Sequence, residues 1–436
     1  MFLLYDLVLL ASSLVLIPWY LLRKARYGTA RRGLRERLGF FAPGRLAPTE
    51  KRPVVWVHAV SVGETRAAIP LLKALRQAYP DACLLVSNTT ETGHSVARSL
   101  AEVDLCLFFP FDLSLVVRRV LNQVRPSLVV FVDTEIWPNF SRIAGKQGIP
   151  LVLANGRISD RSFPRYRMIR FALRPVLKNF SAFCMQSEQD AERIQAIGAL
   201  PERVRVTGNL KFDLQAQMPS AEDVVALKTR FRISPEALVW VAGSTHAGEE
   251  EQVLDAYRQL VAQGRPVVLI LVPRHPERCR QVSEVLAQRH ISFALRSRVD
   301  ERKEVLAPGE VLLVDSIGEM LKFYAMADLV FVGGSLVPVG GHNVLEGVLL
   351  KKAVLYGPHM HNFRDIAKLL REAGAAMEVA DGQGLQQAVA HLIDHPLGRR
   401  ALGEAGYQLI ARNVGATAQT LSVIESLLEK AAEERK

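Results

Sequence analysis

Short apolar runs recur along the chain, and longer amphipathic segments separate most of them. In the first half they are VVWVHAV from residue 54, ACLLVSN from 82, LCLFFPF from 105, SLVVFVD from 127, PLVLANG from 150, SAFCMQS from 181 and RVRVTGN from 203. Most of these runs are apolar throughout, which is typical of strands buried on both faces. Strands that alternate with helices in this way predict a parallel sheet covered by helices on both sides.

The same rhythm restarts in the second half of the chain. Its runs are LVWVAGS from residue 238, PVVLILVP from 266, VLLVDS from 311, ADLVFVGGS from 327 and AVLYGP from 353. A chain of 436 residues is also too long for one core. The segment 211–237 interrupts the rhythm with two prolines and mixed polarity, and its first part is the expected linker. We therefore predict an α/β fold of two Rossmann-like, doubly wound domains, 25–215 and 216–436, the second ending in helices.

The N-terminus predicts a membrane anchor over residues 1–24. Residues 2–22 are predominantly apolar and Asp6 is their only charge, and about 20 apolar residues suffice to cross a bilayer. The Arg- and Lys-rich sequel favours an uncleaved anchor over a signal peptide, whose charges would precede the apolar run. Positive charges on this flank place the domains on the cytoplasmic side and suit anionic inner-membrane lipids. The sequence leaves open whether the helix spans the bilayer or lies in its interface.

Charge and cysteine usage narrow the functional classes. The formal net charge of +11 suits a polyanionic partner such as nucleic acid, an anionic membrane surface or a phosphorylated ligand. The four cysteines are far apart and form no C-x-x-C pair, which argues against a zinc site and a disulfide scaffold. We expect reduced thiols in a cytosolic protein.

In the first half, charged residues follow three of the predicted strands. Ligands of open parallel sheets bind beyond the carboxyl ends of the strands, so a cleft between the two domains is the expected active site. Glu64 stands at the start of a predicted helix, whose dipole favours the ionised carboxylate and lowers its pKa. It is either a base or only a first-turn helix residue. Asp133 and Glu135 follow the run from 127 and could share acid, base or orienting roles. Lys211 lies beside the linker, where it either faces the cleft and balances a negative charge or is only a solvated loop lysine.

In the second half, small residues and a basic residue follow the predicted strands. Ser244 and Thr245 stand in a turn before a helix, where a phosphate can bind. Arg274, directly after a strand, is a good bidentate partner for a phosphate, although a surface arginine is an equal alternative. His359 and His361 are too few for a metal site without other ligands nearby.

The stretch 314–347 is the richest in glycine turns. Ile317-Gly318-Glu319 and Gly333-Gly334-Ser335 each follow a strand. Asn343 and Glu346 have the spacing of a capping box, which explains both residues structurally, while the glycines around this helix start open the backbone to an anion. The absence of a Walker motif and of G-x-G-x-x-G in the sequence weakens ATPase and dinucleotide-binding interpretations.

Taken in order, seven stretches resemble a known family. They are HAVSVGET, TEIWPN, GNLKFD, GSTHAGEE, PRHPER, GGSLVPVGGHNVLEG and YGPHMHNF. The family is that of the membrane-associated 3-deoxy-D-manno-oct-2-ulosonic acid (Kdo) transferases of Gram-negative lipopolysaccharide synthesis, which have the two-domain GT-B architecture. Each motif is short, but together and in order they are highly specific.

The resemblance implies an inverting transfer of Kdo from CMP-Kdo to a lipid A precursor, lipid IVA. It implies Glu64 as general base and Glu135 and Lys211 as residues that assist the transition state. It implies that no metal or other cofactor is needed and that nucleic acid is not a partner. The residues implied to hold CMP are Pro273, Arg274, Ile317, Gly318, Glu319, Asn343, Val344, Leu345 and Glu346.

The sequence departs from the family pattern at two positions, and two other functional interpretations stay open. Members of the family more often have Glu where Asp133 stands and Ala where Gly156 stands, which puts fine acceptor contacts in doubt. Another membrane-associated GT-B glycosyltransferase or a nucleotide-sugar epimerase would share the architecture. A non-catalytic membrane-tethered module would bind nucleotide or lipid without turnover. The sequence does not fix the number of Kdo units transferred or the oligomeric state.

Overall fold

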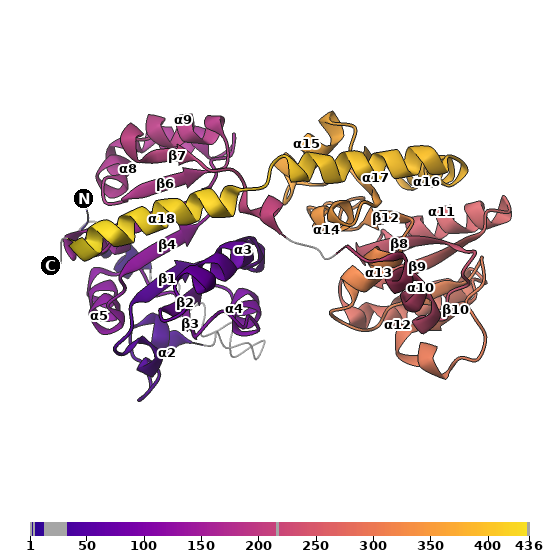
Figure 1. Ribbon diagram of the computed structural model, residues 1–436, viewed down its shortest axis with the longest axis horizontal. Helices are drawn as coiled ribbons and strands as arrows, with labels where there is room; N and C mark the ends of the chain where they lie inside the picture. Colours follow the sequence, from indigo (N-terminus) through magenta and orange to yellow (C-terminus); the bar gives the residue numbers. More distant parts are fainter. Residues whose placement is uncertain (1, 3–4, 13–32, 215–217, 434–436) are drawn as a thin grey trace. The chain divides into compact units, whose positions relative to one another are not determined.

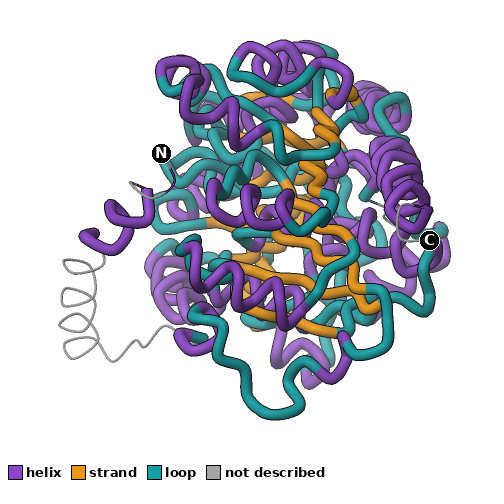
Figure 2. The backbone as a smooth tube through the Cα atoms, turned by 90° about the vertical axis from the view of Figure 1, so that its left-hand side faces the viewer, coloured by secondary structure: helices purple, strands orange, loops and turns teal. Residues whose placement is uncertain are grey.

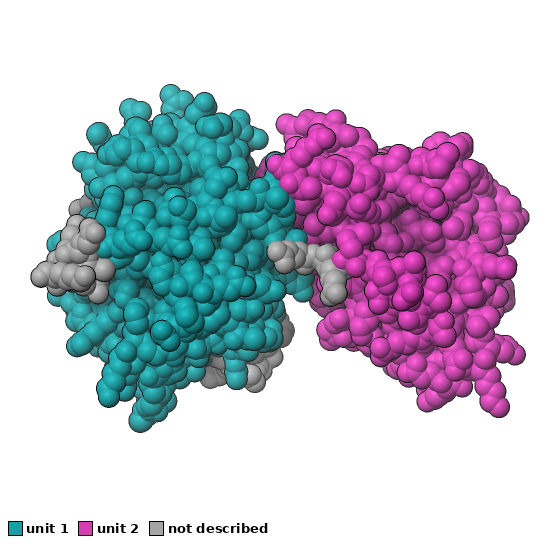
Figure 3. All heavy atoms as spheres, viewed as in Figure 1, with its two compact units in different colours: residues 1–214, 413–436 teal, residues 215–412 magenta. Residues whose placement is uncertain are grey.

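The computed structural model describes residues 2, 5–12, 33–214 and 218–433, and it divides into two compact units. Unit 1 comprises residues 1–214 and 413–436, and unit 2 comprises residues 215–412 (Figure 3). The chain first passes from unit 1 to unit 2 after residue 214, one residue before the predicted boundary at residue 215. The expectation that the second domain extends to residue 436 is wrong, because residues 413–436 belong to unit 1.

Unit 1 is built on one parallel sheet with strand order β3-β2-β1-β4-β5-β6-β7. Its strands are β1 Val54–His58, β2 Cys83–Asn88, β3 Leu105–Phe108, β4 Leu128–Val132, β5 Leu151–Gly156, β6 Ala182–Met185 and β7 Val204–Val206. Its helices and 3-10 turns are α2 Leu34–Arg37, η1 Ala47–Thr49, α3 Val62–Ala78, α4 Glu91–Arg98, α5 Ser114–Val124, α6 Pro138–Lys146, α7 Phe163–Met168, α8 Arg170–Leu177, α9 Glu188–Ala196, η2 Pro201–Arg203, η3 Leu210–Asp213 and α18 Ala416–Glu433. In Figure 2 the strands lie between layers of helices.

Unit 2 repeats this architecture with strand order β10-β11-β9-β8-β12-β13-β14, again all parallel. Its strands are β8 Leu238–Thr245, β9 Val267–Pro273, β10 Phe293–Leu295, β11 Val311–Leu313, β12 Leu329–Val332, β13 Ala353–Tyr356 and β14 Met377–Glu378. Its helices and 3-10 turns are α10 Ala221–Arg230, α11 Glu250–Ala262, η4 Pro276–Arg278, α12 Cys279–Gln288, η5 Arg296–Glu301, α13 Met320–Met326, α14 Leu345–Leu349, α15 Arg364–Glu372, α16 Gly382–Asp394 and α17 Pro396–Ala411. The prediction of two doubly wound parallel sheets is confirmed.

The last helix, α18, returns to unit 1 (yellow in Figure 1). Its Ala416 and Ile424 join a buried apolar cluster with Leu71, Leu72 and Leu75 of α3. At its start, the Asp213 carboxylate accepts hydrogen bonds from the backbone N–H groups of Gly415 (2.7 Å) and Thr417. A carboxylate at a helix N-terminus satisfies open N–H groups and interacts favourably with the helix dipole. This contact and the apolar cluster together explain why α18 belongs to unit 1.

The anchor predicted over residues 1–24 lies mostly outside the described residues. Tyr5–Ser12 are helical. Within the part of the chain that the structure describes, no helix has both the length and the hydropathy needed to cross a bilayer.

Candidate active site

The sheet of unit 1 reverses its strand order at β1, which lies between β2 and β4. At such a switch point the connections after the two neighbouring strands leave in opposite directions and open a crevice for a ligand. Glu64 follows β1, and Asp133 and Glu135 follow β4. The fold therefore brings the predicted acids of unit 1 to the position where ligands of such sheets bind.

Glu64 lies in the first turn of α3, as predicted. Its carboxylate accepts hydrogen bonds from the Val60 N–H at 2.6 Å and the Ser61 hydroxyl at 2.9 Å, and Ser61 is the N-cap of α3. The expectation of a lowered pKa is wrong. Burial and the nearby charge of Asp133 raise the pKa of Glu64, and these effects outweigh the two hydrogen bonds and the attraction of Lys211.

Asp133 is held in a left-handed backbone conformation, with φ of 60°, at the end of β4. Burial raises its pKa, although Lys211 and a 2.5 Å hydrogen bond from the Asn155 amide oppose that shift. The Asn155 Oδ1 atom accepts a hydrogen bond from the Leu210 N–H at 2.9 Å. The backbone of Asn155 is also left-handed, with a φ of 58°. Left-handed residues other than glycine mark positions that the surrounding structure holds in place. Asn155 thus connects Asp133 to the turn that carries Lys211.

Glu135 lies two residues beyond Asp133, half-buried in the loop before α6. Burial, with the charges of Glu64 and Asp133, raises its pKa to about 7. Burial raises the pKa of Tyr166 on α7, and the nearby charge of Glu135 raises it further. A carboxylic acid with a pKa near neutrality can give or take a proton under physiological conditions.

Lys211 lies in the short turn η3, which Asn209 begins by accepting a hydrogen bond from the Lys211 N–H at 3.0 Å. The ammonium group attracts both Glu64 and Asp133, which limits the rise in pKa that burial causes in each. The structure therefore brings together Glu64, Asp133, Glu135 and Lys211 in unit 1. Three carboxylates beside one lysine can share a proton and hold a hydroxyl group for attack.

The raised pKa of Glu135 predicts a pH-dependent stability. The folded state binds this proton more tightly than an ordinary glutamate with a pKa of 4.5, so wild-type stability falls as the pH rises from about 4.5 to about 7. Glu135→Gln cannot lose a proton there. We therefore expect the melting temperature of Glu135→Gln minus that of wild type to increase from pH 5 to pH 8, as measured by differential scanning fluorimetry. A pH-independent difference between the two proteins would contradict the assignment.

In unit 2 the switch point lies at β8, between β9 and β12. The glycine turn after β12 was expected to be open to an anion, but a carboxylate of the protein occupies it. Glu249 is fully buried, and its oxygens accept hydrogen bonds from the N–H groups of Gly334 (2.6 Å), Ser335 (2.8 Å), Leu336 (2.7 Å) and His246 (3.0 Å). The N–H groups of this turn are therefore not available to a phosphate. Thr245, also proposed for a phosphate, is fully buried.

Two histidines that the sequence did not single out meet at this switch point. The Nε2 atoms of His246 and His342 are 2.8 Å apart, and the His275 ring lies 6.0 Å from that of His246. Burial, and then the neighbouring His275, lower the pKa of His246 below its usual value. Because both residues follow central strands, the order of the sheet was the signal that could have identified them.

Arg274 follows β9 at the same end of the sheet, and its side chain is exposed, whereas Pro273 is buried. In the turn after β11, Ile317 is 84% exposed, and Gly318 has a φ of 88° with open space where a Cβ would stand. Burial alone would raise the pKa of Glu319, but hydrogen bonds from Arg296, Ser316 and Lys322 outweigh it and hold the pKa low. The backbone of Ile317 and Gly318, rather than the occupied Glu319 carboxylate, is the accessible part of this turn.

The capping box expected at Asn343 and Glu346 is wrong in detail. Helix α14 begins one residue later than expected, with Val344 as its N-cap. Asn343 Oδ1 accepts a hydrogen bond from the Leu345 N–H at 3.2 Å, and its amide donates to Glu346 at 3.1 Å. The side chains of Val344 and Leu345 are fully buried. Asn343 and Glu346 therefore provide the polar side chains of this segment.

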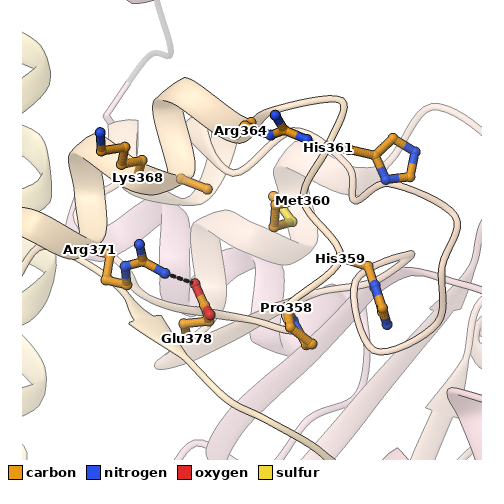
Figure 4. A pocket seen from close by; sticks show the side chains of 9 residues that line it. Pro358, His359, Met360, His361, Arg364, Lys368, Arg371 and Glu378 are labelled. Carbon is orange, nitrogen blue, oxygen red and sulfur yellow. Dashed lines mark hydrogen bonds and ion pairs between the residues drawn. The ribbon is translucent and has the colours of Figure 1, made fainter. Parts of the chain in front are cut away.

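A cavity of about 450 Å³ in unit 2 is formed by the YGPHMHNF stretch and α15 (Figure 4). It is lined by Pro358, His359, Met360, His361, Arg364, Ala367, Lys368, Arg371 and Glu378. Glu378 pairs with Arg371 at 2.7 Å, which leaves the lining mainly basic. The cavity adjoins the glycines before His342: a Cβ at Gly341 would lie 2.2 Å from the Met360 sulfur, and one at Gly340 would lie 2.5 Å from His361 Nε2. Both positions therefore need glycine for this close approach. Among the described residues, no group of three or more His, Cys, Asp or Glu could hold a metal ion.

Comparison with known proteins identifies related chains. The family model of 3-deoxy-D-manno-octulosonic-acid transferase (kdotransferase) matches residues 32–214. A 3-deoxy-D-manno-octulosonic acid transferase of Haemophilus influenzae is 34% identical over 429 residues, which cover 98% of each protein. The solved C-terminal CMP-Kdo binding domain of WaaA from Acinetobacter baumannii is 30% identical and covers 43% of this chain and 96% of its own, with a TM-score of 0.40.

A glycosyltransferase from Rickettsia africae shares the fold over 87% of this chain and 99% of its own, with a TM-score of 0.55 at 13% identity. Both units of the chain thus fit a GT-B-like architecture, as predicted. The near full-length relationship to the Haemophilus enzyme goes further than a shared fold. The chain therefore belongs to the Kdo transferase family and is a glycosyltransferase.

Proposed function

We propose that the protein transfers Kdo from CMP-Kdo to lipid IVA, a lipid A precursor, with inversion at the anomeric carbon and with Glu64 as general base. The observation that carries this proposal is the group of Glu64, Asp133, Glu135 and Lys211 at the switch point of unit 1. Such a group is suited to the activation of a hydroxyl, which is the chemical demand of glycosyl transfer.

The proposed step is a single displacement. The Glu64 carboxylate takes the proton of the acceptor hydroxyl, whose oxygen forms a bond to the anomeric carbon of Kdo. The bond from that carbon to the CMP phosphate oxygen breaks, and CMP leaves with the electron pair. Direct attack by the acceptor, without an intermediate bonded to the protein, inverts the anomeric centre. Lys211 and a protonated Glu135 would stabilise the negative charge that develops.

Unit 2 supports the proposed donor site. Arg274 presents an exposed guanidinium at the carboxyl end of the sheet, and such a group binds a phosphate in a bidentate manner. The open backbone of Ile317 and Gly318 and the side chains of Asn343 and Glu346 lie at turns that follow strands of the same sheet. Asn343 and Glu346 are suited to hydroxyl groups of a ribose, because both offer hydrogen-bond acceptors.

A basic and apolar surface of unit 1 supports an anionic lipid as the acceptor. Helices α7 and α8 expose Met168 (75%) and Phe171 (78%). The segment 161–177 contains no acidic residue and has exposed arginines at 161, 165, 167, 170 and 174. Apolar side chains among arginines suit the interface of an anionic membrane. We place the protein at the cytoplasmic side of the inner membrane, held by an anchor in residues 1–24 and by this surface.

Arg274→Ala tests the donor site. Loss of a charge-assisted phosphate contact costs about 1.5 to 3 kcal/mol, so we expect CMP affinity to fall roughly 10- to 150-fold in isothermal titration calorimetry. The melting temperature should not change, because the side chain is exposed. Arg280→Ala, whose side chain is 89% exposed on α12, is the matched control and should bind CMP as wild type does. Unchanged affinity in Arg274→Ala would remove Arg274 from the donor site.

The decisive experiment incubates the purified full chain with CMP-Kdo and lipid IVA and measures product masses. Each Kdo added increases the acceptor mass by one increment, so the spectrum also gives the number of units. Protection from heat by UDP but not by CMP would instead favour another GT-B transferase or an epimerase. Binding of CMP-Kdo without any product would favour a non-catalytic module.

A further inference from the structure

The N-terminal helix, described at residues 2 and 5–12, presents three side chains to the rest of unit 1. Phe2, Tyr5 and Asp6 share one helical face by their spacing. The Arg142 guanidinium lies 4.7 Å above the Phe2 ring, and the Tyr5 hydroxyl donates a hydrogen bond to Asp112. The opposite face is apolar and exposed, with Leu7 at 56% and Val8 at 54%. The single charge of the apolar N-terminal run therefore faces the protein.

The Asp6 carboxylate makes three hydrogen bonds to unit 1. Its Oδ1 atom accepts from the Ser114 N–H at 3.1 Å and from the Asn139 amide at 2.7 Å. Its Oδ2 atom accepts from the Ser114 hydroxyl at 2.5 Å. Asn139 is fully buried in α6, and its amide also donates to the Asp112 carbonyl at 2.6 Å. The contacts of Asp6 join residues separated by more than 100 positions in the sequence.

Helix α5 lacks a cap of its own. Its N-cap residue, Leu113, has no side chain that can accept a hydrogen bond, and its first turn contains no acidic residue. Asp6 supplies both missing features, because it accepts the first N–H of α5 and places a negative charge at the positive end of the helix dipole. The carboxylate of Asp112 has the same role at α6, where it accepts from the N–H groups of Asn139 (3.1 Å) and Phe140 (2.7 Å).

We propose that Asp6 is a docking residue, which caps α5 from the N-terminal helix and thereby holds that helix on unit 1 in one orientation. The proposal does not depend on the transferase reaction or on the nature of the donor. It assigns a structural reason to the one charge in an otherwise apolar segment.

Hydrogen exchange of the full chain in detergent tests the cap. In Asp6→Ala the Ser114 amide loses its acceptor, so peptides that cover the first turn of α5 should exchange about 5- to 30-fold faster. Asp81→Ala removes an exposed aspartate of the same unit and should leave this exchange unchanged. Unaltered protection of the first turn of α5 in Asp6→Ala would overturn the proposal.

A distance measurement tests the docking. All four native cysteines are buried, so spin labels attach selectively to cysteines introduced at Val8 and at the exposed Arg118 of α5. With Asp6 present we expect a narrow distance distribution, and with Asp6→Ala a broad one. Asp6→Asn keeps the size of the side chain and one acceptor oxygen, so it should be intermediate and serves if the alanine variant does not fold. Distributions that are equally narrow in all three proteins would sink the idea.

Discussion

Glu64→Gln is expected to reduce the rate of Kdo transfer about 10²- to 10⁴-fold, the usual contribution of a general base. Glutamine preserves the size of the side chain: its oxygen can accept from the Val60 N–H and its amide can donate to the Ser61 hydroxyl, but it cannot take a proton. CMP affinity should remain at the wild-type level, because the proposed donor residues lie in unit 2. The measurements are single-turnover kinetics with CMP-Kdo and lipid IVA, and calorimetry with CMP.

Glu188→Gln is the matched control, because Glu188 is an exposed first-turn glutamate of α9 in the same unit. It should retain wild-type turnover. The raised pKa of Glu64 adds a second test, since the base must be ionised to act. The rate should therefore fall, as the pH is lowered, at a higher pH than an ordinary glutamate would give. Retained turnover in Glu64→Gln would show that another group is the base.

Glu249→Ala is expected to have the largest effect on stability. It removes a fully buried carboxylate that accepts four backbone hydrogen bonds, and it leaves those N–H groups unsatisfied. Breaking such an arrangement costs about 3 to 5 kcal/mol. For a unit of about 200 residues this lowers the melting temperature by roughly 6 to 20 °C. Calorimetric unfolding of the full chain measures the shift in the transition of unit 2.

Glu284→Ala, on the exposed side of α12, removes a carboxylate that is 61% exposed and should leave the transition within 1 to 2 °C of wild type, as roughly expected for a surface change. Glu249→Gln should also be destabilised, because its amide N–H groups would face the N–H donors of the turn. If Glu249 instead contacted a ligand, Glu249→Ala would melt as wild type does and bind CMP more weakly.

All the strands of the first sheet and the five inner strands of the second could be predicted from the sequence, whereas the two edge strands of the second sheet could not. Every predicted run forms a strand, because a strand buried on both faces must be apolar at successive positions. The strands that were missed, β10 and β14, lie at the two edges of the second sheet. All three residues of β10 are half-buried, and β14 is two residues long. Such strands leave at most three successive apolar residues in the sequence, which is too short a run to predict a strand.

The residues of the site were easier to predict than their electrostatics. A position after a strand was enough to select Glu64, Asp133, Glu135 and Lys211. The pKa of Glu64 was predicted in the wrong direction because the local rule considered only the helix dipole. Burial and Asp133, which is contributed by another strand, decide the shift. Similarly, the anion that fills the Gly334 turn is a glutamate from 85 positions away, and turn composition alone could not distinguish it from a phosphate.

The return of α18 to unit 1 has a consequence for synthesis on the ribosome. Residues 1–214 of unit 1 precede unit 2 in the chain, but its helix α18 is translated after all of unit 2. A nascent chain that has reached residue 412 contains every candidate catalytic residue, yet α3 lacks its apolar partner and Asp213 lacks the N–H groups that it caps. Unit 1 is therefore completed only after unit 2 has been made, and a chain that stops at residue 412 would leave Glu64 and Lys211 on incompletely packed elements.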